Sequence, residues 1–198
     1  MRSKLLGVLG LSAAVTLLFV LSSSAWPQGS GSSRTTPPAK PRPKTPADFH
    51  REFWQFLTRG KNPYKKWTAW PESAEPRAGE APHGAFVKTY ANAIAIKDTA
   101  ALAHGSILVQ EELDEDQKTL KSVSVMYRVK GTDPDHFDWY WLRYLPDGTV
   151  AKQPGKQPAN QGGKPIAGKV ASCIECHAKA GGDDLVHSND EAAPEEGN

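Results

Sequence analysis

The sequence predicts an α+β domain, predominantly an antiparallel β-sheet with an N-terminal helix and short helices around a late Cys-x-x-Cys-His motif. Three observations support this fold class. Apolar residues recur with helical spacing between residues 49 and 57, and four segments between residues 85 and 145 alternate with a period of two. The motif, at residues 173–177, comes only after these segments. This order argues against an all-helical domain with the motif near its N-terminus.

The first 25 residues have the pattern of an export signal. Arg2 and Lys4 precede an apolar run from Leu5 to Leu21, and the small residues Ser23 and Ala25 follow. This pattern predicts a signal peptide cleaved after Ala25. The length of the run also allows an uncleaved N-terminal membrane anchor. In either case we expect the rest of the chain to be exported to the periplasm.

Charge and composition separate two tails from a central domain. The chain has 24 basic and 22 acidic residues, and removal of residues 1–25 with their two cations leaves equal numbers, which argues against a nucleic-acid partner. Residues 26–46 are rich in Pro, Ser and Gly and predict a flexible linker. Residues 188–198 are acidic and predict a disordered tail. Residues 47–187 remain as a single domain.

The domain is predicted to open with a helix. Thr45 suits the N-cap, Pro46 the first turn, and Asp48 complements the helix dipole. An apolar face follows, and Gly60 and Pro63 end the helix. The residues of this face are Phe49, Phe53, Phe56 and Leu57.

Four strands are predicted in the middle of the domain, because their side chains alternate between two faces. In the first strand Phe86, Lys88 and Tyr90 share one face, and Val87 and Thr89 share the other. An Ala-rich segment at residues 92–103 predicts a short helix. The four strands span residues 85–91, 105–112, 120–130 and 137–145.

The motif itself predicts one covalently attached haem c. Cys173 and Cys176 are the only cysteines, and their spacing suits two thioether bonds to the haem vinyl groups. His177 can then ligate the iron from one face. A redox dithiol would need a thioredoxin-like context, and a structural zinc would need two more ligands. The sequence has neither a thioredoxin-like βαβ pattern before the motif nor a second Cys/His pair at zinc-ligand spacing.

A second axial ligand has several candidates. Five further histidines and Met126 could each complete a low-spin, electron-carrying haem. His83 is the best of them because it precedes the first strand; Met126 is better explained by packing within its strand. The other histidines are His50, His104, His136 and His187. A long loop at residues 152–169 could dock an acidic partner or hold haem propionates through its lysines, although a solvated loop is the simpler reading. These are Lys152, Lys156, Lys164 and Lys169.

Several stretches of the chain, taken in their order and spacing, resemble the cytochrome P-460 / cytochrome c′-beta family across residues 47–187. The matching stretches are PHGAFVKTYAN at 82–92, GSILVQEE at 105–112, VMYR at 125–128 with KG at 130–131, DWYW at 138–141, CIECH at 173–177 and DLV at 184–186. The resemblance implies a β-rich fold, a homodimer and a five-coordinate haem with His177 as proximal ligand.

The family has two subgroups. P-460 enzymes oxidise hydroxylamine and carry a lysine cross-linked to the haem, in a strand of the form G-x-x-x-x-K-E. Here the matching position is Gln110, whose amide is a poor nucleophile, and Val87 stands near the place of an arginine of some P-460 enzymes. The chain is therefore more similar to cytochrome c′-beta, which binds gases such as NO and CO; this favours a protein that is not an enzyme and leaves a haem oxidoreductase as the alternative. Lys88 is the remaining candidate for a cross-link.

The resemblance also suggests roles for other residues. Phe86 is predicted to cap the distal side of the haem, and Arg128 and Arg143 to bind its propionates. If the protein were instead a P-460-type oxidoreductase, Glu111 or Glu112 could move protons. A third hypothesis is a periplasmic electron-transfer cytochrome that docks a redox partner.

Overall fold

The computed structural model describes residues 44–71, 73–153, 163–180 and 184–187. The predicted export segment, most of the linker and the acidic tail lie outside these residues. Within the described part, no helix is both long enough and apolar enough to cross a membrane.

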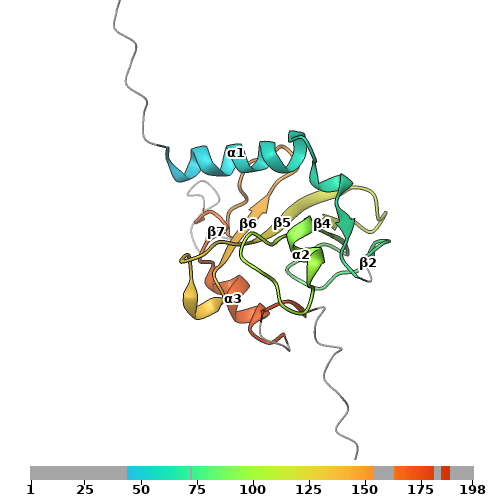
Figure 1. Cartoon of the computed structure of the whole chain (residues 1–198). Helices are drawn as coiled ribbons and strands as arrows, with labels where there is room; N and C mark the ends of the chain where they lie inside the picture. Colours follow the sequence, from blue (N-terminus) through green and yellow to red (C-terminus); the bar gives the residue numbers. More distant parts are fainter. Residues whose placement is uncertain (1–43, 72, 154–162, 181–183, 188–198) are drawn as a thin grey trace, which may run out of the picture. The chain divides into compact units, whose positions relative to one another are not determined.

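A seven-stranded antiparallel sheet forms the centre of the domain and confirms the predicted fold class (Figure 1). Its strands run in the order β1-β3-β4-β5-β6-β7, and β2 pairs with β3 beside β1. The bounds are β1 Thr68–Ala69, β2 Arg77–Ala78, β3 Phe86–Ala91, β4 Ile107–Leu113, β5 Leu120–Arg128, β6 Trp139–Tyr144 and β7 Ala167–Gly168. The four longer strands are those that the alternating sequence predicts, and the two-residue strands are too short to show a period.

The predicted N-terminal helix is α1, Pro46–Arg59. It begins with a capping box, in which the Thr45 hydroxyl accepts from the Asp48 amide (3.2 Å) and the Asp48 carboxylate accepts from the Thr45 amide (2.9 Å). Phe53 and Leu57 are buried, whereas Phe56 is exposed. Of the predicted apolar face, Phe53 and Leu57 therefore pack toward the sheet, whereas Phe56 points to the surface.

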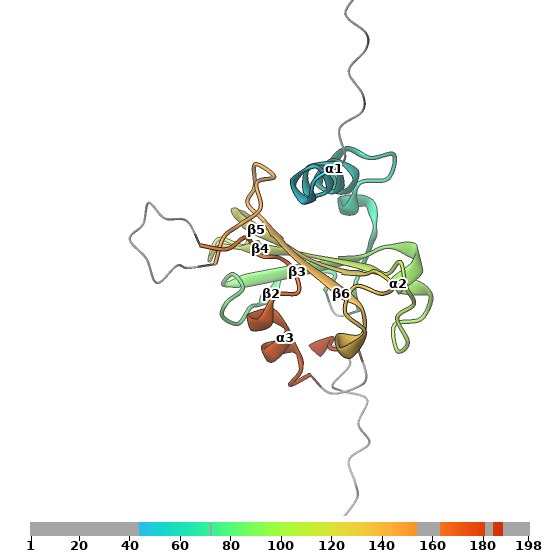
Figure 2. The same ribbon diagram turned by 90° about the vertical axis from the view of Figure 1, so that its left-hand side faces the viewer.

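Two cores lie on opposite faces of the sheet, with α1 over one face and α3, Ala171–His177, over the other (Figure 2). Side chains of β4 contribute to both cores, because Ile107 and Val109 pack under α1 while Leu108 packs on the α3 side. The same alternation continues along β4, so that Gln110 and Glu112 share the α3 face and Glu111 lies on the α1 face. This register decides which polar side chains can meet α3.

The remaining helices are short. The Ala-rich segment forms α2 only over Ala93–Lys97, where the Asn92 side chain caps the helix by accepting from the Ala95 amide. It ends early because the Asp98 carboxylate accepts from the amides of Ala100 and Ala101, which turns the chain. Two 3₁₀ helices complete the domain, η1 at Tyr64–Lys66 and η2 at Pro134–His136.

Candidate haem-binding site

Helix α3 brings both thiols and the adjacent imidazole onto one side. Cys173, Cys176 and His177 stand at positions i, i+3 and i+4, which are neighbours on a helix surface. Ile174 is buried in the core and anchors the helix to the sheet. Cys173 is partly buried, Cys176 is exposed, and both are free thiols. Burial raises the pKa of the Cys173 thiol.

The imidazole of His177 is held in one tautomer. Its Nδ1 lies 2.8 Å from the carbonyl oxygen of Leu185. Because a carbonyl only accepts, Nδ1 must carry the proton and Nε2 keeps its lone pair. Burial is the main cause that lowers the pKa of His177, which favours the neutral ring. This is the form in which histidine ligates a metal.

The segment 184–187 holds the Leu185 carbonyl in position beside His177. The indole of Trp139, which is fully buried, donates from Nε1 to the Asp184 carbonyl oxygen at 2.7 Å. The Asp184 side chain accepts from the Val186 amide, and Leu185 adopts the left-handed conformation with φ 63°. A backbone turned in this way presents the Leu185 carbonyl to α3.

Trp141 on β6 lies directly beside His177, with ring centroids 4.7 Å apart. Its indole N–H is buried, and no acceptor for it occurs among the described residues. Buried N–H groups are rarely left without an acceptor in folded proteins. The unsatisfied donor therefore indicates that a further polar or π-rich group belongs beside His177.

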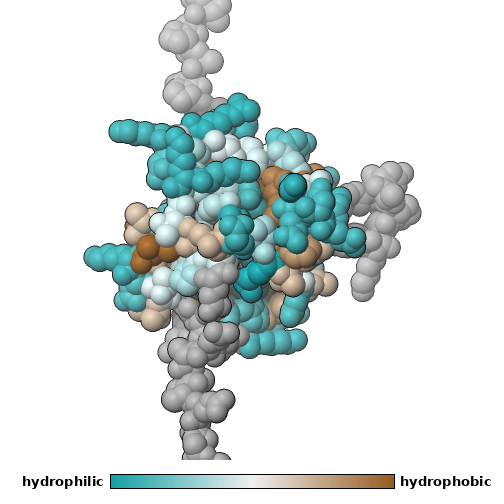
Figure 3. Space-filling model, turned by 90° about the vertical axis from the view of Figure 1, so that its right-hand side faces the viewer, coloured by the Kyte–Doolittle hydropathy of each residue, from teal (hydrophilic) through white to brown (hydrophobic). Residues whose placement is uncertain are grey.

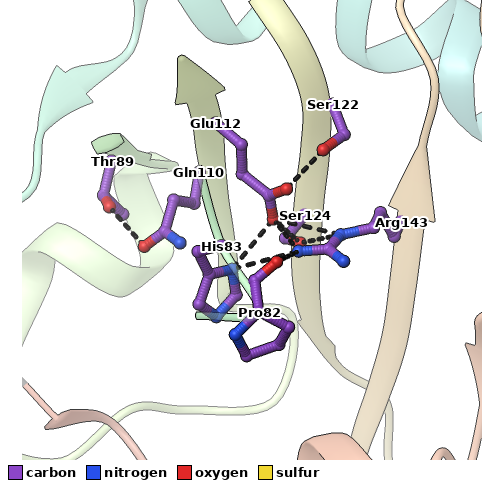
Figure 4. Close-up of polar contacts among 8 residues, drawn as sticks. All are labelled: Pro82, His83, Thr89, Gln110, Glu112, Ser122, Ser124 and Arg143. Carbon is purple, nitrogen blue, oxygen red and sulfur yellow. Dashed lines mark hydrogen bonds and ion pairs between the residues drawn. The ribbon is translucent and has the colours of Figure 1, made fainter. Parts of the chain in front are cut away.

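A buried carboxylate, Glu112, organises the polar part of the α3 face (Figure 4). Its Oε1 accepts from His83 Nδ1 at 2.8 Å, Ser124 Oγ at 2.5 Å and Arg143 Nη2 at 2.6 Å. Its Oε2 accepts from Ser122. The Arg143 Nη2 also donates to the Pro82 carbonyl at 2.8 Å, which ties the loop before β3 to β6.

Glu112 remains charged in this environment. Burial opposes its ionisation, but the hydrogen bonds from His83, Ser122 and Ser124, together with the charge of Arg143, outweigh burial and lower its pKa to about 2. The side chain is 3% exposed, so the charge is shielded from water. On the α3 face of the sheet, Glu112 and Arg143 therefore form an ion pair, and the imidazole of His83 hydrogen-bonds to the same carboxylate.

The chain matches the family model described as Cytochrome P460 over residues 61–188. The chain belongs to the cytochrome P460 family. No curated protein matches the chain significantly. Membership of the cytochrome P460 family supports a haem cytochrome of the P-460 or c′-beta kind and implies a haem cofactor.

The residues on α3 fit the haem of a cytochrome P460 protein. The thiol pair, the neutral imidazole with a free Nε2 and the unsatisfied Trp141 N–H all face the same side of the sheet. Cys173 and Cys176 would hold the macrocycle and His177 its iron. When bound, the iron supplies a coordination position for a small ligand, and the protein tunes it through axial ligation, hydrogen bonding and burial.

Gln110, which the sequence resemblance aligns with the cross-linking lysine of P-460 enzymes, lies on the same face as Glu112. Its side-chain oxygen accepts from Thr89 Oγ1 at 3.3 Å. Lys88 lies on the opposite face, above the ring of Tyr90 at 5.8 Å. The register thus separates the two candidate positions for a cross-link.

The register does not bring Phe86 to this site. Phe86 pairs with Leu113 and alternates with Val87, which pairs with Glu112. Phe86 therefore shares the face of Lys88 and the α1 core, away from His177. On β3, the buried side chains on the α3 face are those of Val87, Thr89 and Ala91. The alternation was readable from the sequence, but which face α3 would cover was not.

The two candidate acids are separated in the same way. Glu111 lies on the α1 face, where Oε1 accepts from Tyr64 at 2.8 Å and pairs with Lys65 at 2.9 Å. Only Glu112 lies near α3. Of the two arginines predicted to bind propionates, Arg143 belongs to the Glu112 cluster. Arg128 instead donates to the carbonyls of Phe137 and Leu102 and joins two loops.

Most other candidates are placed elsewhere. His50 bonds Tyr140, while His104 and His136 pair with Asp138 and Asp133. Met126 packs against the core on the α3 face. Lys169 pairs with Asp133 at 2.9 Å, Lys152 and Lys164 are exposed, and Lys156 lies outside the described residues.

Sequence reasoning missed the cluster as a unit. His83 and Glu112 are 29 residues apart, and Glu112 and Arg143 are 31 residues apart. The sequence signal for this cluster was that Glu112 stands two residues after Gln110 and therefore on the same face of the strand.

Proposed function

We propose that this protein is an exported c-type cytochrome of the c′-beta kind that binds small gases such as NO and CO. One haem c would be held by Cys173 and Cys176, with His177 as proximal ligand of an iron that is five-coordinate when ready to bind gas. The observation that carries the proposal is Gln110. It lies on the α3 face of β4. The family resemblance aligns this residue with the cross-linking lysine of P-460 enzymes.

The chemistry of Gln110 supports gas binding over hydroxylamine oxidation. An amide nitrogen shares its lone pair with the carbonyl and cannot attack the macrocycle as a lysine amine can. On this face the buried, apolar side chain of Leu108 lies on one side of it, and the buried, apolar Val87 lies beside Glu112 of the polar cluster on the other. An apolar surface near the iron admits neutral diatomic molecules and disfavours charged ligands.

A P-460-type enzyme is the second candidate, and the Glu112 cluster favours it. A buried carboxylate that bonds an imidazole is an arrangement that can hold and move protons. Substrate oxidation would also need a periplasmic redox partner to accept electrons. An electron-transfer cytochrome is the third candidate and would require two strong axial ligands at all times.

The visible spectrum of the purified, haem-loaded ferrous protein tests the proposal. We expect an unshifted Soret band and a large change when CO is added. A strongly red-shifted Soret band with turnover of hydroxylamine would replace the proposal by the enzyme. A spectrum that does not respond to CO would replace it by the electron carrier.

We also propose a homodimer, with the apolar groove between α1 and the sheet as the contact surface. Phe56 and Ile94 are 51% and 46% exposed and line this groove with Phe49 and Tyr127. On the face in Figure 3, apolar residues form patches among hydrophilic ones. Light scattering should give a dimer for the wild type and a monomer for Phe56→Glu, while Leu145→Glu, which changes another exposed apolar residue, stays dimeric. A monomeric wild type would refute this arrangement.

A further inference from the structure

We infer that Tyr140 and His50 form a redox-active pair, in which one-electron oxidation of the phenol moves its proton to Nε2 of the imidazole. Trp141 connects this pair with the position of His177. The inference rests on the haem that the proposed function places at α3, but it adds an activity on the other face of the sheet. There Tyr140 returns an electron to a haem that a peroxide has oxidised.

The first argument is the bond between the two side chains. The hydroxyl oxygen of Tyr140 lies 2.8 Å from Nε2 of His50, within the distance for proton transfer to a base. No other hydrogen-bond partner of this hydroxyl occurs among the described residues. With the phenol as donor, the neutral ring carries its own proton on Nδ1 and accepts at Nε2. Burial lowers the pKa of His50 and raises that of Tyr140, which favours the neutral form of both groups before oxidation.

A base in contact with the phenol changes what oxidation produces. An oxidised phenol that keeps its proton is a cation and a strong acid, whereas loss of the proton leaves a neutral radical. His50 is buried and Tyr140 is half-buried, so the acceptor has to be a neighbouring side chain. An imidazole can hold the proton and give it back when the phenol is reduced.

Tyr144 shows that the pair is more than a link between α1 and β6. Tyr144 lies on the same strand and face as Tyr140, and its hydroxyl already ties α1 to β6 by donating to the carbonyl oxygen of His50 at 2.9 Å. A backbone carbonyl cannot take up the proton of an oxidised phenol. Of these two tyrosines, Tyr140 is therefore the one that has a base within reach.

The second argument is the route to α3. Trp141 follows Tyr140 in β6, so their Cα atoms are about 3.8 Å apart. Their side chains point to opposite faces, with Trp141 in the core on the α3 side and Tyr140 packed against the core under α1 (Figure 2). The ring centroid of Trp141 lies 4.7 Å from that of His177. Indole and phenol are both oxidisable by one electron, so an electron from Tyr140 can cross the sheet through Trp141.

The oxidant is a peroxide that reacts at the haem. Cleavage of its O–O bond takes up two electrons, of which the iron supplies one and Tyr140, through Trp141, the other. The phenolic proton passes to His50 and leaves a neutral tyrosyl radical. A small reductant such as ascorbate later restores the electron, and the proton returns from His50. The ring of Phe49, edge-on to Tyr140 at 5.6 Å between centroids, helps to shield the radical.

The test mixes the haem-loaded ferric full chain with hydrogen peroxide and records electron paramagnetic resonance after rapid freezing. We expect a tyrosyl radical in the wild type that is lost in Tyr140→Phe. Tyr144→Phe is the matched control, because it removes the same atom from the same strand face, and it should keep the radical. His50→Gln retains an acceptor without a base, and it should lower the yield of the radical.

A second measurement does not depend on the folding of these variants. A fluorinated tyrosine at position 140 keeps the hydroxyl and should change the hyperfine pattern of the signal. An unchanged pattern overturns the assignment to Tyr140, as does a tyrosyl signal that survives in Tyr140→Phe or is lost in Tyr144→Phe. An undiminished yield in His50→Gln overturns the role of His50.

CO binding to the ferrous protein separates this inference from the proposed function. A wild type that binds CO but forms no tyrosyl radical with peroxide overturns the inference alone. A wild type that forms the radical at Tyr140 but binds no CO overturns the proposed gas binding and leaves the redox pair intact.

Discussion

The hydroxyl of Tyr64 donates a 2.8 Å hydrogen bond to Oε1 of Glu111, on the face of β4 opposite the Glu112 cluster. Both side chains are buried, and Lys65 closes the carboxylate from the surface. Tyr90 donates to the other oxygen at 3.4 Å. A charged group is thus satisfied beneath η1 without any part in the haem site.

Replacement of Tyr64 by Phe should lower the free energy of unfolding by about 1.5–3 kcal/mol, the range for a hydrogen bond to a charged group. Tyr90→Phe is the matched control, since it removes the same atom from a longer contact, and it should cost less than half as much. Urea denaturation of both variants measures the difference. Equal losses would show that the shorter bond has no special role.

The same tyrosines predict weaker stability at alkaline pH. Burial, followed by the charge of Glu111, raises the pKa of Tyr90 to about 12 and that of Tyr64 further. A raised pKa in the folded state means that the stabilisation is complete below the unfolded value, about 10, and is lost as pH rises through the folded value. Between these values each such tyrosine should reduce the free energy of unfolding by about 1.4 kcal/mol per pH unit.

Denaturant unfolding between pH 9 and pH 11.5 measures this slope. Tyr64→Phe should remove one tyrosine's share of it, although the variant is less stable throughout. A slope identical to that of the wild type would mean that Tyr64 ionises at the same pH in both states.

Gln110→Lys should introduce the nucleophile that this chain lacks. Its amine would stand on the α3 face between Thr89 and Ser124, the register neighbours of position 110. We expect a red-shifted ferrous Soret band, as a third covalent link to haem would produce. Gln110→Leu keeps the size of the side chain but has no amine, and its spectrum should match that of the wild type. Identical spectra for both variants would argue against a haem edge near position 110.

The two thiols should contribute separately to haem attachment. Cys173→Ala and Cys176→Ala should each retain haem through one thioether, at reduced yield, whereas the double variant should lose it on a denaturing gel. Haem stain and the pyridine haemochrome spectrum measure these outcomes. Ser172→Ala, next to Cys173 on α3, is the control. Covalent haem in the double variant would show that another residue forms the link.

Helices and strands were predictable where the alternation of apolar and polar residues continues for several residues. The helix from Pro46 and the four strands of six to nine residues show clear periods, and each is present. The paired strands β1, β2 and β7 contain two residues each and depend on their neighbours for pairing. Helix α2 is shorter than its composition suggested because Asp98 offers the backbone competing hydrogen bonds.

The site was predictable in part, for a related reason. Cys173, Cys176 and His177 are contiguous, so the helix that carries them needed no tertiary information. Phe86 could be assigned to a strand face but not to a side of the sheet, which depends on where α3 packs. The bonds of Glu112 join segments about thirty residues apart and follow only from the strand register.

The adjacent carboxylates Glu111 and Glu112 help to set the register of β4 against its neighbouring strands. Glu111 and Glu112 point to opposite faces, and each finds donors only on its own side. A slip of β4 by one residue would send each carboxylate into the wrong layer, where a buried charge without partners is strongly unfavourable. The two carboxylates therefore stabilise the native register of β4 relative to a register shifted by one residue.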